Sequence, residues 1–169
     1  MRNRKFITFG VGITIGEGVV IDGLSKNGVK IGDGVSIGPH SIIEGTGVIS
    51  SIGVGCSIGQ NSGIGAFSFI GAAGGVTIGS DVIMGQRISF HSENHRFDDI
   101  EIIIRKQGVT REGITVGDIC WVGANVVFLD GSNIGAGSVV AAGAVVRGIF
   151  PPNCVIGGVP AKILRMRDL

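Results

Sequence analysis

The chain has 169 residues, 14 of them basic and 13 acidic, so its formal net charge is +1. This balance excludes a polybasic nucleic-acid-binding domain and an acidic disordered tail, since both concentrate one sign of charge. Glycine is the compositional outlier, with 32 residues against a usual share of about 7%. A chain so rich in glycine and aliphatic residues is expected to be globular only if its glycines recur at a fixed period.

The N-terminal segment MRNRKFITFGVG is basic but has no apolar stretch long enough for a signal peptide. No apolar run approaches the roughly 18 residues of a membrane-spanning helix. The three cysteines lack the paired spacing of a disulfide framework or of a Cys-x-x-Cys metal site: Cys56, Cys120 and Cys154. These features favour a single domain over residues 1–169, located in the cytoplasm, without membrane insertion and without a nucleic-acid partner.

Pairs of an aliphatic residue and a glycine recur from residue 9 onward, and their spacing is six wherever it is unbroken. The apolar residues form five frames with this spacing: Phe9, Ile15 and Ile21; Ile31, Ile37, Ile43 and Ile49; Ile52, Ile58, Ile64 and Ile70; Ile78, Met84 and Phe90; and Val116, Val122, Phe128, Ile134, Val140 and Val146. A regular glycine would cost a helix about 1 kcal/mol each time. Since six is a multiple of two, the apolar residue stays on one side of an extended segment. The repeat therefore predicts short strands joined by tight corners, three strands to a coil, with the aliphatic residues inside.

This aliphatic-Gly-x-x-x-x pattern covers most of residues 9–146 and resembles the hexapeptide-repeat acyltransferase family. The resemblance implies an all-β fold, a left-handed parallel β-helix of about seven triangular coils. The handedness comes from the resemblance alone, because the usual crossover rule would give the opposite hand.

The repeat breaks between about residues 91 and 113, where nine charged residues gather, a third of all those in the chain. The core of a solenoid cannot hold such a segment, so it is predicted to be an extruded loop. Insertions of this kind often carry the functional site. The repeat then resumes, and residues 151–169 are expected to form a C-terminal tail that caps the coils.

The segment from the loop to the tail, including ITVGDICWVGANVVFLDGSNIGAGSVVAAGAVVRGIFPPNCVIGGVPAKILR, is similar to the sugar O-acetyltransferases over almost all of residues 91–166. The resemblance implies acetyl transfer from acetyl-CoA to a sugar hydroxyl. The helical N-terminal segment of the galactoside and maltose transferases is not seen here, so capsule, exopolysaccharide or lipopolysaccharide sugars are the expected acceptors. Two alternatives stay open: N-acetylation of an amino nucleotide-sugar, and a non-catalytic solenoid or assembly protein.

The resemblance places the catalytic base at His95. A sugar hydroxyl is a poor nucleophile, and an imidazole can take its proton as the oxygen attacks the thioester. Glu93, Asn94 and Asp98 are expected to contact the acceptor. Either Glu93 or Asp98 is a candidate for orienting the His95 ring.

The other two histidines are expected to have structural roles, His91 within the loop and His40 at a coil corner. The related γ-class carbonic anhydrases bind zinc through three histidines, two of them in an H-x-x-x-x-H spacing. Here His91 and His95 have a shorter spacing and His40 lies far upstream. No metal site is therefore predicted, since a catalytic zinc needs three protein ligands.

The resemblance implies that the pantetheine arm of acetyl-CoA lies in a groove along the coils, where small residues let it approach the backbone. The matching positions are Ala124, which follows Trp121-Val122-Gly123, and Ala142. The expected CoA contacts therefore include Trp121. Three cations would face the CoA phosphates: Arg147, Lys162 and Arg165.

A homotrimer with a site between adjacent chains is also implied by the resemblance. Several repeat positions expected on the outer faces are apolar or small, and an isolated prism would leave them exposed: Val19, Val29, Val35, Val48, Val54, Ala66 and Ala124. In this assembly His95 is expected to lie opposite the neighbour's Ala142 and Arg147.

Overall fold

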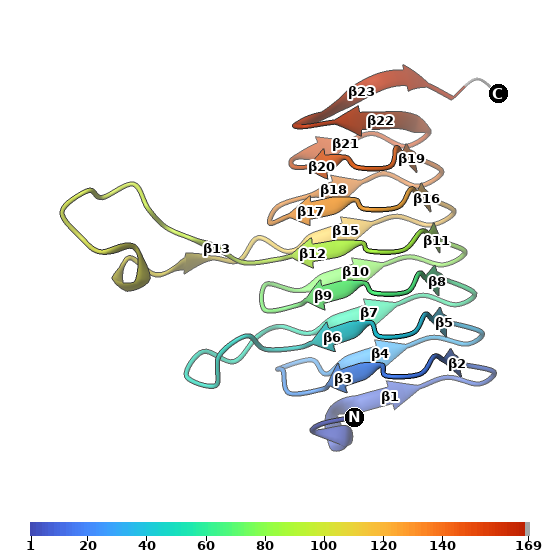
Figure 1. Ribbon diagram of the computed structural model, residues 1–169, viewed down its shortest axis with the longest axis horizontal. Helices are drawn as coiled ribbons and strands as arrows, with labels where there is room; N and C mark the ends of the chain where they lie inside the picture. Colours follow the sequence, from blue (N-terminus) through green and yellow to red (C-terminus); the bar gives the residue numbers. More distant parts are fainter. Residues whose placement is uncertain (168–169) are drawn as a thin grey trace.

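The computed structural model describes residues 1–167, which form a stack of coils from which one long loop projects (Figure 1). Three sheets run along the stack, and we number its faces in the order in which the chain visits them. The first face contains β1 (Ile7–Phe9), β4 (Val29–Ile31), β7 (Cys56–Ile58), β10 (Val76–Ile78), β15 (Ile114–Val116), β18 (Asn133–Ile134) and β21 (Ile149–Phe150). The second contains β2 (Thr14–Ile15), β5 (Ser36–Ile37), β8 (Gly63–Ile64), β11 (Ile83–Met84), β16 (Trp121–Val122), β19 (Val139–Val140), β22 (Cys154–Gly158) and β23 (Ala161–Met166). The third contains β3 (Val20–Asp22), β6 (Ile42–Glu44), β9 (Phe69–Gly71), β12 (Ser89–His91), β17 (Val127–Leu129) and β20 (Val145–Val146).

Each strand of a face pairs in parallel with the strand one coil away, except for β23, which pairs antiparallel with β22. The fold is the left-handed parallel β-helix that the sequence predicts. The pairing stacks like residues in register, so that Ile58, Ile78 and Val116 form one inner rank. All three side chains are at most 3% exposed. At the third face the rings of Phe90 and Phe128 stack with their centroids 4.6 Å apart.

Two residues predicted on the outer faces, Val29 and Val35, are instead fully buried. The reason is strand alternation, because Val29 lies two residues before Ile31 and Val35 two before Ile37, so each valine points inward with its isoleucine. The other outward positions are at least partly exposed: Val19, Val48, Val54, Ala66 and Ala124.

The prediction that Ile49 lies inside is also wrong, because its side chain is 81% exposed. Residues 46–52 leave the coil between β6 and β7 and form a small loop, closed by a bridge between Val48 and Ser51 (Figure 1). The frame shift between Ile49 and Ile52 in the sequence marks this second insertion.

The long loop leaves the coil after β12 and returns at β15. It contains β13 (Asn94–His95), the short 3₁₀ helix η2 (Ile104–Lys106) and β14 (Val109–Thr110). Strands β13 and β14 pair antiparallel, with Asn94 opposite Thr110 and His95 opposite Val109. The loop therefore projects from the coils on a two-stranded neck.

Only part of the predicted C-terminal tail caps the stack. Residues Cys154–Gly158 continue the second face as β22, and β23 then turns back over the end of that face. Residues 168–169 of the predicted tail lie outside the described residues. Within residues 1–167, neither short helix, η1 (Arg4–Phe6) nor η2, has the length to cross a membrane.

Candidate active site

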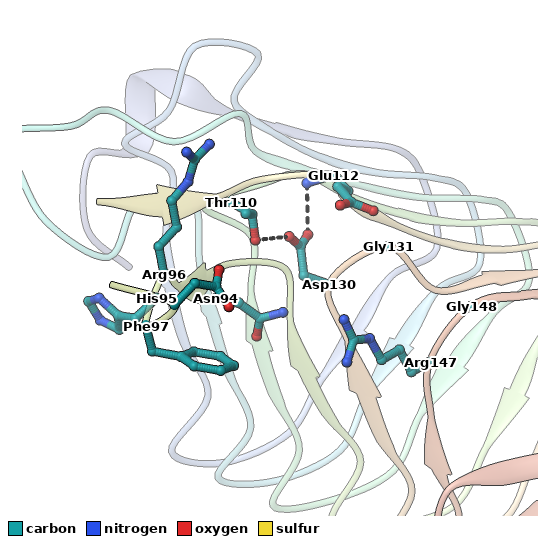
Figure 2. Close-up of a pocket in the computed structure, with 11 residues that line it drawn as sticks. Asn94, His95, Arg96, Phe97, Thr110, Glu112, Asp130, Gly131, Arg147 and Gly148 are labelled. Atoms are coloured by element: carbon teal, nitrogen blue, oxygen red, sulfur yellow. Dashed lines mark hydrogen bonds between the residues drawn. The ribbon is translucent and has the colours of Figure 1, made fainter. Parts of the chain in front are cut away.

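The long loop and the coils enclose a pocket of about 260 Å³ at the corner between the third and first faces (Figure 2). It contains His95 together with the predicted acceptor contacts Asn94 and Asp98. Its lining is Asn94, His95, Arg96, Phe97, Asp98, Thr110, Glu112, Asp130, Gly131, Arg147 and Gly148. The pocket therefore collects residues from the outgoing strand, the returning strand and two coils.

His95 is exposed and lies on β13, and its imidazole points away from Arg147 in Figure 2. Among the contacts of residues 1–167, no hydrogen bond from Glu93 or Asp98 orients this ring. The Glu93 carboxylate instead pairs with Arg111, with Oε2 2.6 Å from Nη2. Neither Glu93 nor Asp98 therefore contacts the His95 ring by a hydrogen bond within the described residues, and the imidazole is open to solvent.

Two buried polar side chains fasten the neck of the long loop to the coils. Ser92 donates to the Gly71 carbonyl at 2.7 Å and accepts from the Gly74 N–H at 2.9 Å. On the returning side, Asp130 is 5% exposed. Its side chain accepts hydrogen bonds from the Thr110 hydroxyl and from the backbone N–H groups of Glu112 and Gly113. Sequence reasoning missed Asp130 and Arg111, because neither lies in a recognisable motif.

Arg147 lies in the same pocket as His95 of its own chain (Figure 2). Both the long loop and Arg147 follow a third-face strand, β12 and β20 respectively, so both occur at one corner of the prism. Ala142, which follows β19, lies instead at the corner between the second and third faces. The expectation that His95 faces Ala142 and Arg147 of a neighbouring chain concerns an assembly of chains and stays a prediction.

The other predicted CoA contacts lie on the second face and at its corner with the third face. Ala124 and Ala142 occupy successive corners that stack closely, since a Cβ added at Gly123 would lie 2.5 Å from the Ala142 nitrogen. Trp121 is 58% exposed on β16. Lys162 and Arg165 are exposed on β23, opposite Gly157 and Val155. These five residues share one side of the stack, away from the corner that carries His95.

The remaining histidines lie apart from His95. His40 is at the corner between the second and third faces, with φ 57°, and its ring stacks on that of Phe67 at 5.2 Å. His91 ends β12, and its ring lies 5.7 Å from that of Phe69. Within residues 1–167, no three His, Cys, Asp or Glu side chains gather as a metal site.

All three cysteines are buried and unpaired by disulfide bonds. Burial raises the pKa of the Cys56 thiol from 9.0 to about 12, and burial also raises the pKa of Cys120. Both groups are therefore protonated at neutral pH, and a thiol is a poor nucleophile compared with a thiolate.

The coils that follow the long loop match a known sequence family. Residues 113–148 match the family described as bacterial transferase hexapeptide (six repeats). The matched residues are thus similar to hexapeptide-repeat transferases, and they form coils of the parallel β-helix.

The chain is 36% identical over 97 residues to the putative lipopolysaccharide biosynthesis O-acetyl transferase WbbJ of Escherichia coli, a match that covers 53% of this chain and 50% of that protein. The chain spans half or less of the length of this and other curated relatives that it matches.

Solved structures share the fold over nearly the whole chain. A hexapeptide-repeat acetyltransferase from Vibrio cholerae, complexed with acetyl-CoA, is 25% identical with a TM-score of 0.60, covering 98% of this chain and 74% of that one. AntD, an N-acyltransferase from Bacillus cereus solved as a mutant with dTDP-4-amino-4,6-dideoxyglucose and coenzyme A, has a TM-score of 0.79 at 20% identity. That match covers 96% of this chain and 84% of AntD.

Proposed function

We propose that this chain is an acetyl-CoA-dependent O-acetyltransferase that acts in the cytoplasm on a sugar hydroxyl in capsule, exopolysaccharide or lipopolysaccharide biosynthesis. The observation that carries the proposal is the exposed His95, held on a fastened loop beside a pocket of polar residues. The similarity of the coils to a lipopolysaccharide O-acetyl transferase supports the same class of reaction.

In the proposed mechanism, the His95 imidazole removes the proton from the acceptor hydroxyl as its oxygen attacks the thioester carbonyl. The carbon–sulfur bond then breaks, the acetyl group stays on the sugar oxygen, and the departing CoA sulfur takes the proton from the imidazolium. No covalent acetyl-enzyme is required. Asn94 and Asp98 offer an amide and a carboxylate to sugar hydroxyls within the pocket.

The donor is proposed to lie along the second face, with its pantetheine arm against Ala124 and Ala142 beside Trp121. Lys162 and Arg165 supply cations near one end of that path. Since one chain keeps these residues away from His95, the proposal requires a second chain whose donor surface meets this loop.

The character of the three faces supports a homotrimer. The first face has mostly polar outward residues: Thr8, Lys30, Ser57, Thr77, Thr115 and Asn133. Apolar side chains face outward on the second face, including Ile83, Trp121, Val139 and Val155, and on the third, including Ile42, Phe69, Val127 and Val145. A closed ring of three copies, each packing its second face near the third face of the next, would cover both apolar faces and leave the polar face in water.

A transfer screen tests the proposed function. The wild-type chain is incubated with acetyl-CoA and a panel of sugars and amino nucleotide-sugars, with a blank that contains no acceptor. The free CoA thiol is measured with a colorimetric reagent. Thiol release that depends on a neutral sugar and disappears in His95→Ala supports O-acetylation. Release only with amino nucleotide-sugars would favour N-acetylation, and no CoA binding would favour a non-catalytic solenoid.

A further inference from the structure

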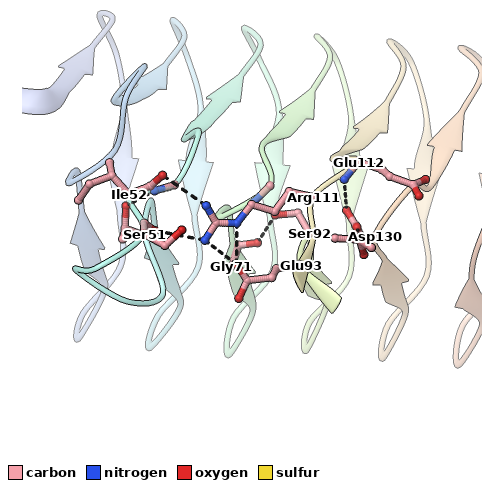
Figure 3. Close-up of polar contacts among 12 residues, drawn as sticks. Ser51, Ile52, Gly71, Ser92, Glu93, Arg111, Glu112 and Asp130 are labelled. Carbon is pink, nitrogen blue, oxygen red and sulfur yellow. Dashed lines mark hydrogen bonds and ion pairs between the residues drawn. The ribbon is translucent and has the colours of Figure 1, made fainter. Parts of the chain in front are cut away.

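We propose that Arg111 is a positioning residue that holds the His95 loop at a fixed place against the coils. This inference rests on the proposed function of His95. Arg111 directly follows β14, and Glu93 directly precedes β13, so the two residues face each other across the neck one step from the Asn94–Thr110 pair (Figure 3).

An ion pair between Arg111 and Glu93 joins the two sides of the neck. Arg111 donates from Nε to Glu93 Oε2 at 2.7 Å, and its Nη2 lies 2.6 Å from the same oxygen. The two side chains are 19% and 24% exposed, so water screens them less than it screens a surface pair. In residues 1–167 this is the one ion pair within 4 Å between side chains of opposite charge.

The same guanidinium also reaches the small loop of residues 46–52. Its Nη2 donates to the Ser51 carbonyl at 3.2 Å, and its Nη1 donates to the Ile52 carbonyl at 3.4 Å (Figure 3). Arg111 therefore joins both strands of the neck to a segment about 60 residues earlier in the chain. A guanidinium suits this task because its donors point in several fixed directions, whereas a lysine ammonium is a single point charge.

These contacts matter for the proposed base, His95, because the residues that make them lie around the same pocket. Glu93, His95 and Arg111 share a pocket of about 390 Å³ with Val48 and Ser51 of the small loop. His95 follows Glu93 by two residues on the outgoing side of the neck, so a shift of the neck moves the imidazole. A displacement of about 1 Å at a reacting group can cost roughly 100-fold in rate.

The test combines kinetics with hydrogen–deuterium exchange on the full-length protein. In Arg111→Gln we expect kcat to fall roughly 10- to 100-fold, with the KM for acetyl-CoA and the melting temperature close to wild type. Exchange over residues 93–97 and 107–110 should quicken, while peptides of β9 and β10 should stay unchanged. Lys106→Gln, which removes an exposed cation from the same loop, is the matched control and should change neither readout.

Two further variants keep the proposal falsifiable if Arg111→Gln fails to fold. Arg111→Lys should restore only part of kcat, because one ammonium cannot serve Glu93 and both carbonyls. The double variant Glu93→Gln/Arg111→Gln should have a kcat only slightly lower than that of Arg111→Gln alone, since both substitutions break the same ion pair.

Unchanged exchange at the neck in Arg111→Gln would overturn the proposal, even if the enzyme proves to act on another acceptor or not at all. A raised KM for the sugar with kcat and exchange unchanged would also overturn it, because Arg111 would then bind the acceptor directly. Faster exchange at the neck in Arg111→Gln, in a protein with no transferase activity, would support the positioning role of Arg111 while contradicting the proposed function.

Discussion

The buried carboxylate of Asp130 accepts a hydrogen bond from the hydroxyl of Thr110 at 3.0 Å, joining the returning strand of the long loop to the coil after β17 (Figure 2). The other carboxylate oxygen accepts from the N–H groups of Glu112 and Gly113, each at 2.9 Å. One side chain thus holds three residues, Thr110, Glu112 and Gly113, on the path by which the loop re-enters the coils.

Removing this carboxylate should destabilise the chain. In Asp130→Ala, two backbone N–H groups and one hydroxyl lose their acceptor, and we expect the free energy of unfolding to fall by about 1–3 kcal/mol. Urea denaturation followed by circular dichroism measures the change. Asp118→Ala is a suitable control, because exposed Asp118 accepts a single bond from the Ser80 N–H. Equal losses in the two variants would contradict the role given to Asp130.

Replacing the proposed base should remove catalysis but leave donor binding intact. His95→Ala is expected to lower kcat by about 10²- to 10⁴-fold, the usual contribution of a general base. The dissociation constant of CoA, measured by calorimetry, should stay nearly unchanged. His91→Ala, which alters the other histidine of this region, should be far milder. Near wild-type turnover in His95→Ala would show that another group takes the proton.

The cations of β23 are expected to serve the donor and not the acceptor. Lys162→Ala and Arg165→Ala should raise the KM for acetyl-CoA more than the KM for the sugar, because each removes a positive charge near the proposed CoA phosphates. The effect of each variant should shrink with dephospho-CoA as carrier if the 3′-phosphate is contacted. An equal loss for both substrates would argue against a donor-specific role.

The apolar second face should be needed for assembly. Ile83→Glu places a charge at a side chain that is 66% exposed on β11, and we expect it to convert trimers to monomers in light scattering. Thr77→Glu alters the first face in the same coil and should leave the trimer intact.

Mixed subunits carrying His95→Ala and Ala142→Trp should regain part of the activity if each site spans two chains. A fully active wild-type monomer would exclude the trimer.

The raised pKa of Cys56 predicts a specific loss of stability in alkali. Between pH 9 and pH 12 the unfolded thiol ionises while the folded thiol, with a pKa of about 12, stays protonated. The folded state therefore binds more protons there, and its stability falls as pH rises, by roughly 1 kcal/mol per pH unit. Below pH 9 this contribution is fully present. Cys56→Ala should flatten the alkaline limb of a plot of unfolding free energy against pH, whereas an identical slope would show that the thiol is not protected.

The six-residue period determined the coil architecture, because side-chain alternation and corner glycines are local properties that repeat along the chain. The same period located the long loop, where Glu93 to Glu112 break it with charge, and the resemblance singled out His95 within it. The errors at Val29 and Val35 arose because each valine lies two residues before an inward isoleucine and so points the same way. The error at Ile49 arose because a short insertion shifts the frame without breaking the apolar pattern.

Only the tertiary structure decided which residues meet at the site. Arg111 donates to the Ser51 carbonyl, and Asp130 accepts from Thr110, because segments one or two coils apart are stacked at the same corner. The sequence repeat does not indicate which segments share that corner. Arg147 joins His95, while Ala142 lies at another corner, for the same reason: each residue's face depends on its phase within the coil and on the insertions before it. A local repeat fixes the inward direction of a side chain, but partners across coils depend on the accumulated register of the whole stack.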